Sequence, residues 1–290
     1  MLLKITLFSI TLILGGQVGW ADTVNVARAE NDKGRLPDVL LNAALKRGAV
    51  YDVRYPYGEI ETLPLSTRIN GLKNGELDVF YALATPEYEK DFIPVYIPIY
   101  RGMMGMRLAI IKQQNSDLFA GVKNIGDLKA FTAGQGKFWA DSKILEFNAV
   151  PLVKELKYKN LFPMLEADRF DYFPRGIQEP WAEVTQHASL GLTVDKHIML
   201  WYIAPFYYFV PRSKPALAKH LTEQLELMIE DGSFITLFNE DPYIQSALSE
   251  ANVAERTIVK LKNPFLSEKT PIDRKELWYT PSYSTTDKTL

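Results

Sequence analysis

The residue types that most often carry catalysis are sparse in this chain of 290 residues, and their spacing matches no catalytic motif. The sequence contains no cysteine, which excludes thiol nucleophiles and disulfide bonds. Its histidines, His187, His197 and His220, lack the spacing of metal ligands, and neither an HExxH nor a GxSxG motif occurs. The sequence therefore predicts no catalytic residue, no metal and no cofactor, and it favours binding over turnover.

Arg175 is the clearest candidate for holding a ligand. It comes shortly after the predicted strand FDYF at 170–173 and stands beside Gly176. A guanidinium group at the carboxyl end of a strand can bind a carboxylate through two parallel hydrogen bonds. The alternative is an ion pair with Glu179 or Glu183 on the following helix, and the sequence leaves both possibilities open.

The tripeptide Gly-Gln-Gly at 134–136 is a second candidate contact. It follows a predicted short strand over 131–133 and leads into a predicted helix over 138–147. Free backbone N–H groups at a helix start favour an anion, although the loop matches neither a phosphate loop nor a dinucleotide fingerprint. We therefore expect it to contact a ligand carboxylate. Trp139, in the first turn of that helix, is either a stacking wall or a core residue.

The elements that must position these residues are clearest between Leu72 and Arg107. A helix end at Asn74–Gly75 precedes the apolar run LDVFYALA at 77–84, which has the length and composition of a buried strand. Thr85–Pro86 ends that strand, because proline has no N–H to donate to a neighbouring strand. A helix followed by a buried strand favours an open α/β sheet, in which ligands bind beyond the carboxyl ends of the strands.

The preceding residues predict the rest of one doubly wound lobe with the order β-α-β-α-β. Its remaining elements are strands over 24–29 and 51–55 and helices over 37–48 and 64–72. Arg28 and Glu30 lie at the carboxyl end of the first strand, where they meet a ligand or form an exposed ion pair. Tyr57 lies in an aromatic loop after the second strand. Further along the chain, the apolar pattern over 213–231 predicts an amphipathic helix, which buries leucines at 217, 221 and 225.

The order of these pieces resembles the family 3 periplasmic solute-binding proteins, which include the polar amino-acid receptors of ABC importers. Four segments carry the resemblance: NGELDV at 74–79, ATPEYEKDF at 84–92, LAII at 108–111 and IGDLKAFTAGQGKFW at 125–139. The resemblance implies an α/β fold of the type II periplasmic binding class. Two lobes, each a doubly wound sheet with flanking helices, form a clamshell that closes around a small molecule by hinge motion.

The lobes are predicted to be discontinuous in sequence. Residues 22–105 and 205–290 form the first lobe, and 106–204 form the second. The two crossover segments, Met103 to Arg107 and Ala204 to Phe206, are the predicted hinge. From the first lobe, Tyr81, Thr85 and Arg28 are expected to close over a ligand that the second lobe holds.

Two positions depart from the amino-acid receptors that the chain resembles. The arginine that holds the α-carboxylate in those receptors falls at Tyr88, and the acidic residue that holds the α-ammonium falls near Arg175 and Gly176. A zwitterion would leave both of its charges uncompensated in a closed cleft. Together with Arg175, the resemblance therefore implies a small polar, carboxylate-bearing solute that is not a standard α-amino acid.

The first 21 residues predict a secretory signal peptide that is cleaved after Ala21. They combine one positive charge, Lys4, with a short apolar core and the small-x-small site Gly19-Trp20-Ala21. The apolar core is shorter than the roughly 20 residues of a membrane-spanning helix. We therefore expect a periplasmic protein.

The composition and the resemblance together predict a binding function. With 33 basic and 35 acidic residues and no basic run, the chain lacks the charge pattern of a nucleic-acid-binding protein. The predicted function is the capture of a solute by a monomer and its delivery to an inner-membrane ABC permease. Alternatives are a ligand sensor of a signalling system and, less favoured, an enzyme on the same scaffold. The candidate ligand-binding residues are Arg28, Glu30, Tyr57, Tyr81, Thr85, Tyr88, Gln135, Gly136, Trp139 and Arg175.

Overall fold

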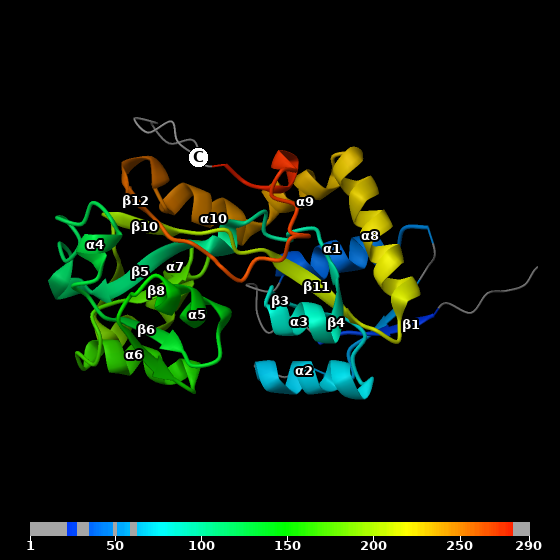
Figure 1. Cartoon of the computed structure of the whole chain (residues 1–290), viewed down its shortest axis with the longest axis horizontal. Helices are drawn as coiled ribbons and strands as arrows, with labels where there is room; N and C mark the ends of the chain where they lie inside the picture. Colours follow the sequence, from blue (N-terminus) through cyan, green and yellow to red (C-terminus); the bar gives the residue numbers. More distant parts are fainter. Residues whose placement is uncertain (1–21, 28–34, 49–50, 59–62, 281–290) are drawn as a thin grey trace, which may run out of the picture.

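The chain folds into two lobes that lie side by side, with α1, α2, α3 and α8 in one and α4 to α7 in the other (Figure 1). This computed structural model describes residues 22–27, 35–48, 51–58 and 63–280. Within these ranges, none of the helices combines the length and the apolar character that crossing a membrane requires. The predicted signal peptide and the candidates Arg28 and Glu30 lie outside the described residues.

The first lobe contains two small sheets. Its strands are β1 (Thr23–Asn25), β2 (Asp52–Arg54), β3 (Phe80–Leu83), β4 (Phe92–Val95) and β11 (Phe206–Pro211). β1 and β2 are parallel, whereas β11 lies between β3 and β4 and is antiparallel to both. A parallel bridge between Val26 and Val79 links the two sheets. Because β11 follows β3 by more than a hundred residues, the chain must leave this lobe and return to it.

Helices cover the first lobe and continue toward the second. They are α1 (Arg35–Leu45), α2 (Leu65–Asn74), α3 (Pro86–Asp91), α8 (Pro215–Glu230), α9 (Ser233–Glu240) and α10 (Pro242–Glu250). α2 ends at Gly75, whose φ of 77° is the left-handed conformation that glycine adopts easily, and this confirms the predicted helix end. α8 buries Leu217, Leu221 and Leu225 in a core that it shares with α1.

The acidic segment after Thr85 forms the short helix α3. The Thr85 hydroxyl accepts a hydrogen bond from the Tyr88 N–H at 3.2 Å, and Pro86 occupies the first helical position. Proline fits there because its missing N–H would have no partner in the first turn. The same two residues that end the strand therefore also start a helix, and this helix places Tyr88 beside β3.

The second lobe contains a mixed sheet and a parallel pair of strands. Its strands are β5 (Met106–Lys112), β6 (Ala133–Gly136), β7 (Leu152–Glu155), β8 (Phe173–Gly176), β9 (Leu192–Val194), β10 (Ile198–Trp201) and β12 (Thr257–Lys260), and its helices are α4 (Ile125–Leu128), α5 (Ala140–Phe147), α6 (Tyr158–Glu166) and α7 (Pro180–Gln186). β5 is antiparallel to β8, β9 and β10, and β6 is parallel to β7. A bridge between Ala133 and Tyr172 links the pair to the sheet.

One predicted lobe boundary needs a correction. β12 pairs in parallel with β10, from Thr257 opposite Ile198 to Lys260 opposite Trp201. This part of the C-terminal segment therefore belongs to the sheet of the second lobe, although the sequence prediction placed all of 205–290 in the first. The reason is a long-range pairing, for which the sequence between α10 and the tail carries no local signal.

The two crossover segments meet directly. The Tyr202 N–H donates to the Gly105 carbonyl at 3.1 Å, and Gly105 ends a short 3-10 helix over Met103–Gly105. Beyond this contact, β5 enters the second lobe and the chain returns through Pro205 to β11. The crossovers thus lie at the positions predicted for the hinge.

Candidate ligand-binding cleft

A cavity of about 200 Å³ lies between the two lobes. Both lobes contribute side chains to it, and half of the predicted ligand-binding residues are among them. The lining residues are Leu65, Tyr81, Ala82, Leu83, Thr85, Tyr88 and Phe206 from the first lobe, and Met104, Arg107, Phe138, Trp139, Ala140, Asp141, Arg175 and Glu179 from the crossover and the second lobe. The structure therefore brings together Tyr81, Thr85, Tyr88, Trp139 and Arg175, as the sequence predicted.

Three other predicted residues lie away from the cavity. Gln135 and Gly136 are buried within β6, and the Gln135 amide donates to the carbonyl of Pro174 at 3.2 Å. The predicted glycine loop is thus a strand, because its backbone pairs with β7. Tyr57 lies elsewhere in the first lobe, where its hydroxyl donates to the carboxylate of Glu76.

Gly136 acts on the cavity indirectly, through Trp139. A β-carbon at Gly136 would collide with the Trp139 indole, so the absence of a side chain lets the ring lie against the backbone of β6. Trp139 also stacks on Phe173 with ring centroids 6.2 Å apart. It is therefore both a wall of the cavity and part of the aromatic packing behind it, which combines the two roles that the sequence left open.

Arg175 lies inside β8, where it is paired with two carboxylates from the segment that follows. Its Nε and Nη2 donate to the two oxygens of Glu183, both at 2.8 Å, and Nη2 also donates to Glu179 at 2.8 Å. Burial disfavours the charge, but the two carboxylates hold the pKa of Arg175 well above its ordinary value. The ion-pair alternative from the sequence is thus present, and a ligand role for Arg175 stays a prediction.

Arg107 forms a second buried ion pair in the cavity. Its Nη2 donates to the carboxylate of Asp141, and its Nε donates to the Tyr202 hydroxyl at 3.0 Å. Tyr202 donates in turn to Asp141, and burial raises the pKa of Tyr202 well above its ordinary value. Asp141 stands in the first turn of α5, so the helix start that was predicted to face a ligand anion carries a carboxylate of the chain itself.

An ion pair joins the lobes at the edge of the cleft. Lys143 of α5 donates to Glu87 of α3 at 2.7 Å. This hydrogen bond holds the pKa of Glu87 below its ordinary value. Because both side chains are about half exposed, the pair contributes about 1 kcal/mol at most to the contact between the lobes.

Several cavity residues were not predicted from the sequence. Arg107 is the lone charged residue of the apolar run over 103–111, and a single arginine in a buried strand is a usable signal. From the sequence, Glu179 is predicted only as an ion-pair partner of Arg175. Phe206 belongs to an aromatic stretch that resembles core, and Asp141 resembles any acidic residue in a first helical turn.

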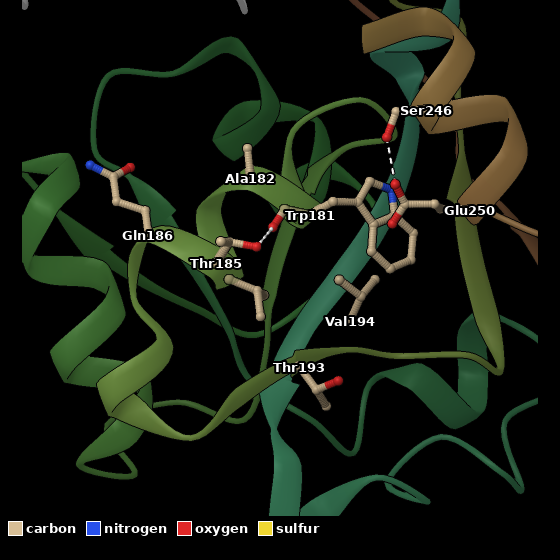
Figure 2. A pocket seen from close by; sticks show the side chains of 9 residues that line it. Trp181, Ala182, Thr185, Gln186, Thr193, Val194, Ser246 and Glu250 are labelled. Atoms are coloured by element: carbon tan, nitrogen blue, oxygen red, sulfur yellow. Dashed lines mark hydrogen bonds between the residues drawn. The ribbon is translucent and has the colours of Figure 1, made fainter. Parts of the chain in front are cut away.

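Figure 2 shows a second hollow, which residues of α7, β9 and α10 line. Trp181 and Glu250 both line it, and Ser246 donates a hydrogen bond to the Glu250 carboxylate (Figure 2). Glu250 is the one ionisable residue that lines this hollow, and none of the predicted ligand-binding residues lines it. The cavity between the lobes is therefore the better candidate site.

Comparison with known proteins supports the fold. No protein-family model and no curated protein sequence matches the chain. A solved ancestral arginine-binding protein bound to glutamine is 17% identical with a TM-score of 0.54, and the match covers 77% of this chain and 99% of that one. An ancestral amino acid-binding protein, a precursor of cyclohexadienyl dehydratase, is 16% identical with a TM-score of 0.54. That match covers 75% of this chain and 94% of that one.

A third solved structure agrees with these two. It is a periplasmic His/Glu/Gln/Arg/opine family-binding protein from Silicibacter pomeroyi in complex with lysine. It is 13% identical with a TM-score of 0.51, and the match covers 72% of this chain and 85% of that one. Identities this low establish likeness of fold alone. The chain therefore has the two-lobed α/β fold of the periplasmic solute-binding proteins, as its resemblance in sequence implied.

Proposed function

We propose that the chain binds a small polar solute between its lobes in the periplasm and delivers it to an ABC importer. The observation that carries this proposal is the cavity of about 200 Å³ itself, which takes side chains from both lobes and lies beside the crossover contact of Gly105 and Tyr202. Closure of the lobes would bury a solute there. The similar solved structures support the proposal, since they are described as binding amino acids.

The proposal is less specific than the sequence prediction in one respect, the chemistry of the ligand. The sequence also predicted a carboxylate on the ligand, gripped by Arg175. The guanidinium of Arg175 already binds Glu183 and Glu179, and the start of α5 carries Asp141. A ligand carboxylate would have to displace one of these groups, so the proposal is limited to a small polar solute.

Catalysis and sensing are the competing functions. One similar structure is a precursor of an enzyme, so the scaffold itself permits catalysis. In this cavity, however, Arg107, Asp141, Arg175 and Glu179 bind one another, and a general acid or base must exchange its proton with a substrate. A sensor would use the same clamshell, and neighbouring genes for a permease and an ATPase, as opposed to a histidine kinase or a cyclase, would favour transport.

Binding is tested by thermal unfolding against a library of small polar solutes, together with native mass spectrometry of protein purified without refolding. A true ligand at 100 times its dissociation constant stabilises the protein by about 2.7 kcal/mol. Ordinary α-amino acids such as glutamine and histidine are expected to stabilise it little, because Tyr88 stands where the resemblance in sequence implies a carboxylate-binding arginine.

A matched pair of tryptophans provides the control for this test. Trp139→Ala removes a wall of the cavity and should weaken binding of whichever solute is found, whereas Trp181 does not line the cavity, so Trp181→Ala should leave binding unchanged. A clear shift with glutamine or histidine contradicts the exclusion of α-amino acids. If neither the library nor mass spectrometry yields a bound solute, the proposed function is wrong.

Export is tested separately. We expect the mature protein to begin at Asp22 and to appear in the periplasmic fraction. The structure supports this cleavage site, since the carbonyl of Asp22 already accepts a hydrogen bond from the Asp52 N–H at 3.0 Å and β1 starts at the next residue. N-terminal sequencing of the periplasmic protein checks the prediction. Recovery of the intact chain from Met1 in a membrane pellet contradicts it.

A further inference from the structure

We propose that the segment from Leu261 to Tyr279, which we call the C-terminal strap, is a third part of the hinge and restricts how far the two lobes rotate against each other. This role goes beyond the proposed function, because it concerns the motion of the lobes and holds whichever solute binds. Three observations carry it: the path of the strap between the lobes, its hydrogen bonds to both crossover segments, and its anchors on each lobe.

The strap is the return path of a second excursion of the chain into the second lobe. After α9, the chain passes through α10 to β12, which pairs with β10 of the second lobe. The strap then leads back to the first lobe (Figure 1). The chain therefore passes between the lobes twice more than the two crossover segments account for. A hinge of two neighbouring segments rotates through changes in a few backbone angles, whereas a further connection must also change its own contacts when the lobes move.

The start of the strap is hydrogen-bonded to the second crossover segment. The Leu261 N–H donates to the carbonyl of Trp201 at 2.9 Å, and the Asn263 side-chain amide donates to the carbonyl of Ile203 at 2.9 Å. These two carbonyls lie at and just after the end of β10, directly before the chain returns through Pro205. A change in the backbone angles of this segment must therefore either break these bonds or move the strap with it.

The end of the strap is bonded to the first crossover segment. The Tyr279 N–H donates to the Arg101 carbonyl at 2.7 Å, and Nη2 of Arg101 donates to the Trp278 carbonyl at 3.4 Å. The Trp278 ring lies on Gly102, where a β-carbon would come within 2.6 Å of it. Arg101 has a φ of 49°, which is unfavourable for a residue with a side chain and persists where the surroundings hold it. The strap thus holds the residues directly before the turn over Met103–Gly105.

Each end of the strap is also anchored to a different lobe. In the second lobe, the side chain of Asn148 at the end of α5 donates to the Lys262 carbonyl at 2.7 Å and accepts from the Lys262 N–H at 3.0 Å. In the first lobe, Arg274 binds the two carboxylate oxygens of Glu226 in α8 at 2.6 and 2.9 Å. Two parallel hydrogen bonds fix the direction of a contact as well as its position. Leu277 adds a side chain buried in the core that α8 and α1 share.

Packing, and not length, makes the strap restrictive. Between Asn263 and Arg274 a fully extended chain would span more than about 30 Å, so its length alone would allow a wide rotation of the lobes. The intervening residues are packed instead: Phe265 lies against the core of the second lobe, and Thr270 is buried. Rotation of the lobes must therefore separate the strap from the surfaces that it covers.

The relative orientation of the lobes is directly measurable, because the chain contains no cysteine. Lys129→Cys at the end of α4 and Glu223→Cys in α8 therefore introduce spin labels at two chosen, exposed positions, one on each lobe. Pulsed electron paramagnetic resonance then gives the distribution of distances between the two labels, with no solute added. The width of this distribution reports how far the lobes rotate.

Releasing both crossover segments from the strap should widen that distribution. Asn263→Ala combined with Trp278→Ala removes the hydrogen bond to the Ile203 carbonyl and the ring that covers the first crossover. Because each lost contact is comparable to one hydrogen bond, we expect the population of orientations outside the original range to rise about five- to thirtyfold. The control is Asn160→Ala combined with Phe147→Ala, which removes a hydrogen bond and an exposed ring within the second lobe and should leave the distribution unchanged.

A cut in the strap tests the same point in a protein that has already folded. A protease recognition sequence is inserted between Glu268 and Lys269, which are both exposed, and the distance distribution is recorded before and after cleavage. Cleavage should widen the distribution, because the part of the strap bound to the second lobe then no longer continues into the part bound to the first. The same insertion and cleavage at the exposed Gly121 should not widen it.

Widening by the double variant or by the cut, with both controls unchanged, supports the inference. If neither change widens the distribution, or if the controls widen it equally, the strap does not restrict the lobes and the inference is wrong. No solute takes part in either measurement, so the outcome is independent of the proposed function. A restrictive strap is compatible with a failed search for a solute, and a bound solute is compatible with a strap that restricts nothing.

Discussion

Replacing Glu183 by alanine is expected to lower the free energy of unfolding by about 3–5 kcal/mol. Glu183 is fully buried and accepts hydrogen bonds from Arg175 Nε and Nη2 at 2.8 Å and from the Tyr158 hydroxyl at 2.6 Å. Without it, the buried guanidinium of Arg175 keeps Glu179 as its carboxylate partner, at 2.8 Å. An uncompensated buried charge is costly because neither water nor a counter-ion replaces the lost carboxylate. Equilibrium unfolding in urea measures the change.

Two further variants make this result specific. Gln186→Ala, at an exposed position of the same helix α7, should change the stability by no more than about 0.5 kcal/mol. The double variant Arg175→Met with Glu183→Leu should recover most of the loss, because no buried guanidinium then lacks its carboxylate and Glu179 still lies 3.6 Å from Arg107. If Glu183→Ala is nearly neutral, Arg175 does not depend on this ion pair, and its guanidinium is available to a ligand, as the sequence first suggested.

Gly105→Ala is expected to destabilise the protein by about 3 kcal/mol or more. Gly105 lies where the two crossover segments meet, and a β-carbon there would overlap the carbonyl oxygen of Tyr202 and come within 3.2 Å of the Ala204 β-carbon. The obstacle is backbone, which cannot rotate away as a side chain can. Relief would require the crossovers to separate, and this would also change the relative position of the lobes.

Thermal unfolding and solution scattering together measure both consequences of Gly105→Ala. The control is Gly121→Ala, since no atom lies within 4 Å of the corresponding β-carbon and the position is exposed. We expect that variant to match the wild type within about 0.5 kcal/mol. If Gly105→Ala leaves both the stability and the scattering profile unchanged, the crossovers do not make this close contact and the hinge lies elsewhere.

Local sequence signals were sufficient for much of the fold. The end of α2 at Gly75, the break at Thr85–Pro86 and the apolar face of α8 all depend on residues within one or two turns of each other. The same is true of the aromatic and polar residues that follow β3. Because the carboxyl end of a strand and the residues after it lie at one edge of a sheet, Tyr81 in β3 and Thr85 and Tyr88 after it could be placed in the cleft from the sequence.

The charges of the site were decided only by the tertiary structure. Arg107 pairs with Asp141, 34 residues later, and with Glu179, and nothing in the sequence distinguishes these carboxylates from the other acidic residues of the chain. The sequence allowed Arg175 either to bind a ligand or to form an ion pair, and the fold places Glu183 against it. Pairing across lobes and strands depends on which elements pack together, as the joining of β12 to β10 also does.

The sequence, through its resemblance to a known family, thus determined the two-lobed α/β class, and it predicted five of the fifteen described residues that line the cleft. The tertiary structure decided which charges the chain neutralises internally, and it brought the carboxylates of Asp141 and Glu179 into the lining of the cavity. The physical reason is that helices, strand ends and turns are set by neighbours along the chain, whereas the electrostatic balance of a buried site is set by groups that the fold brings together from distant positions.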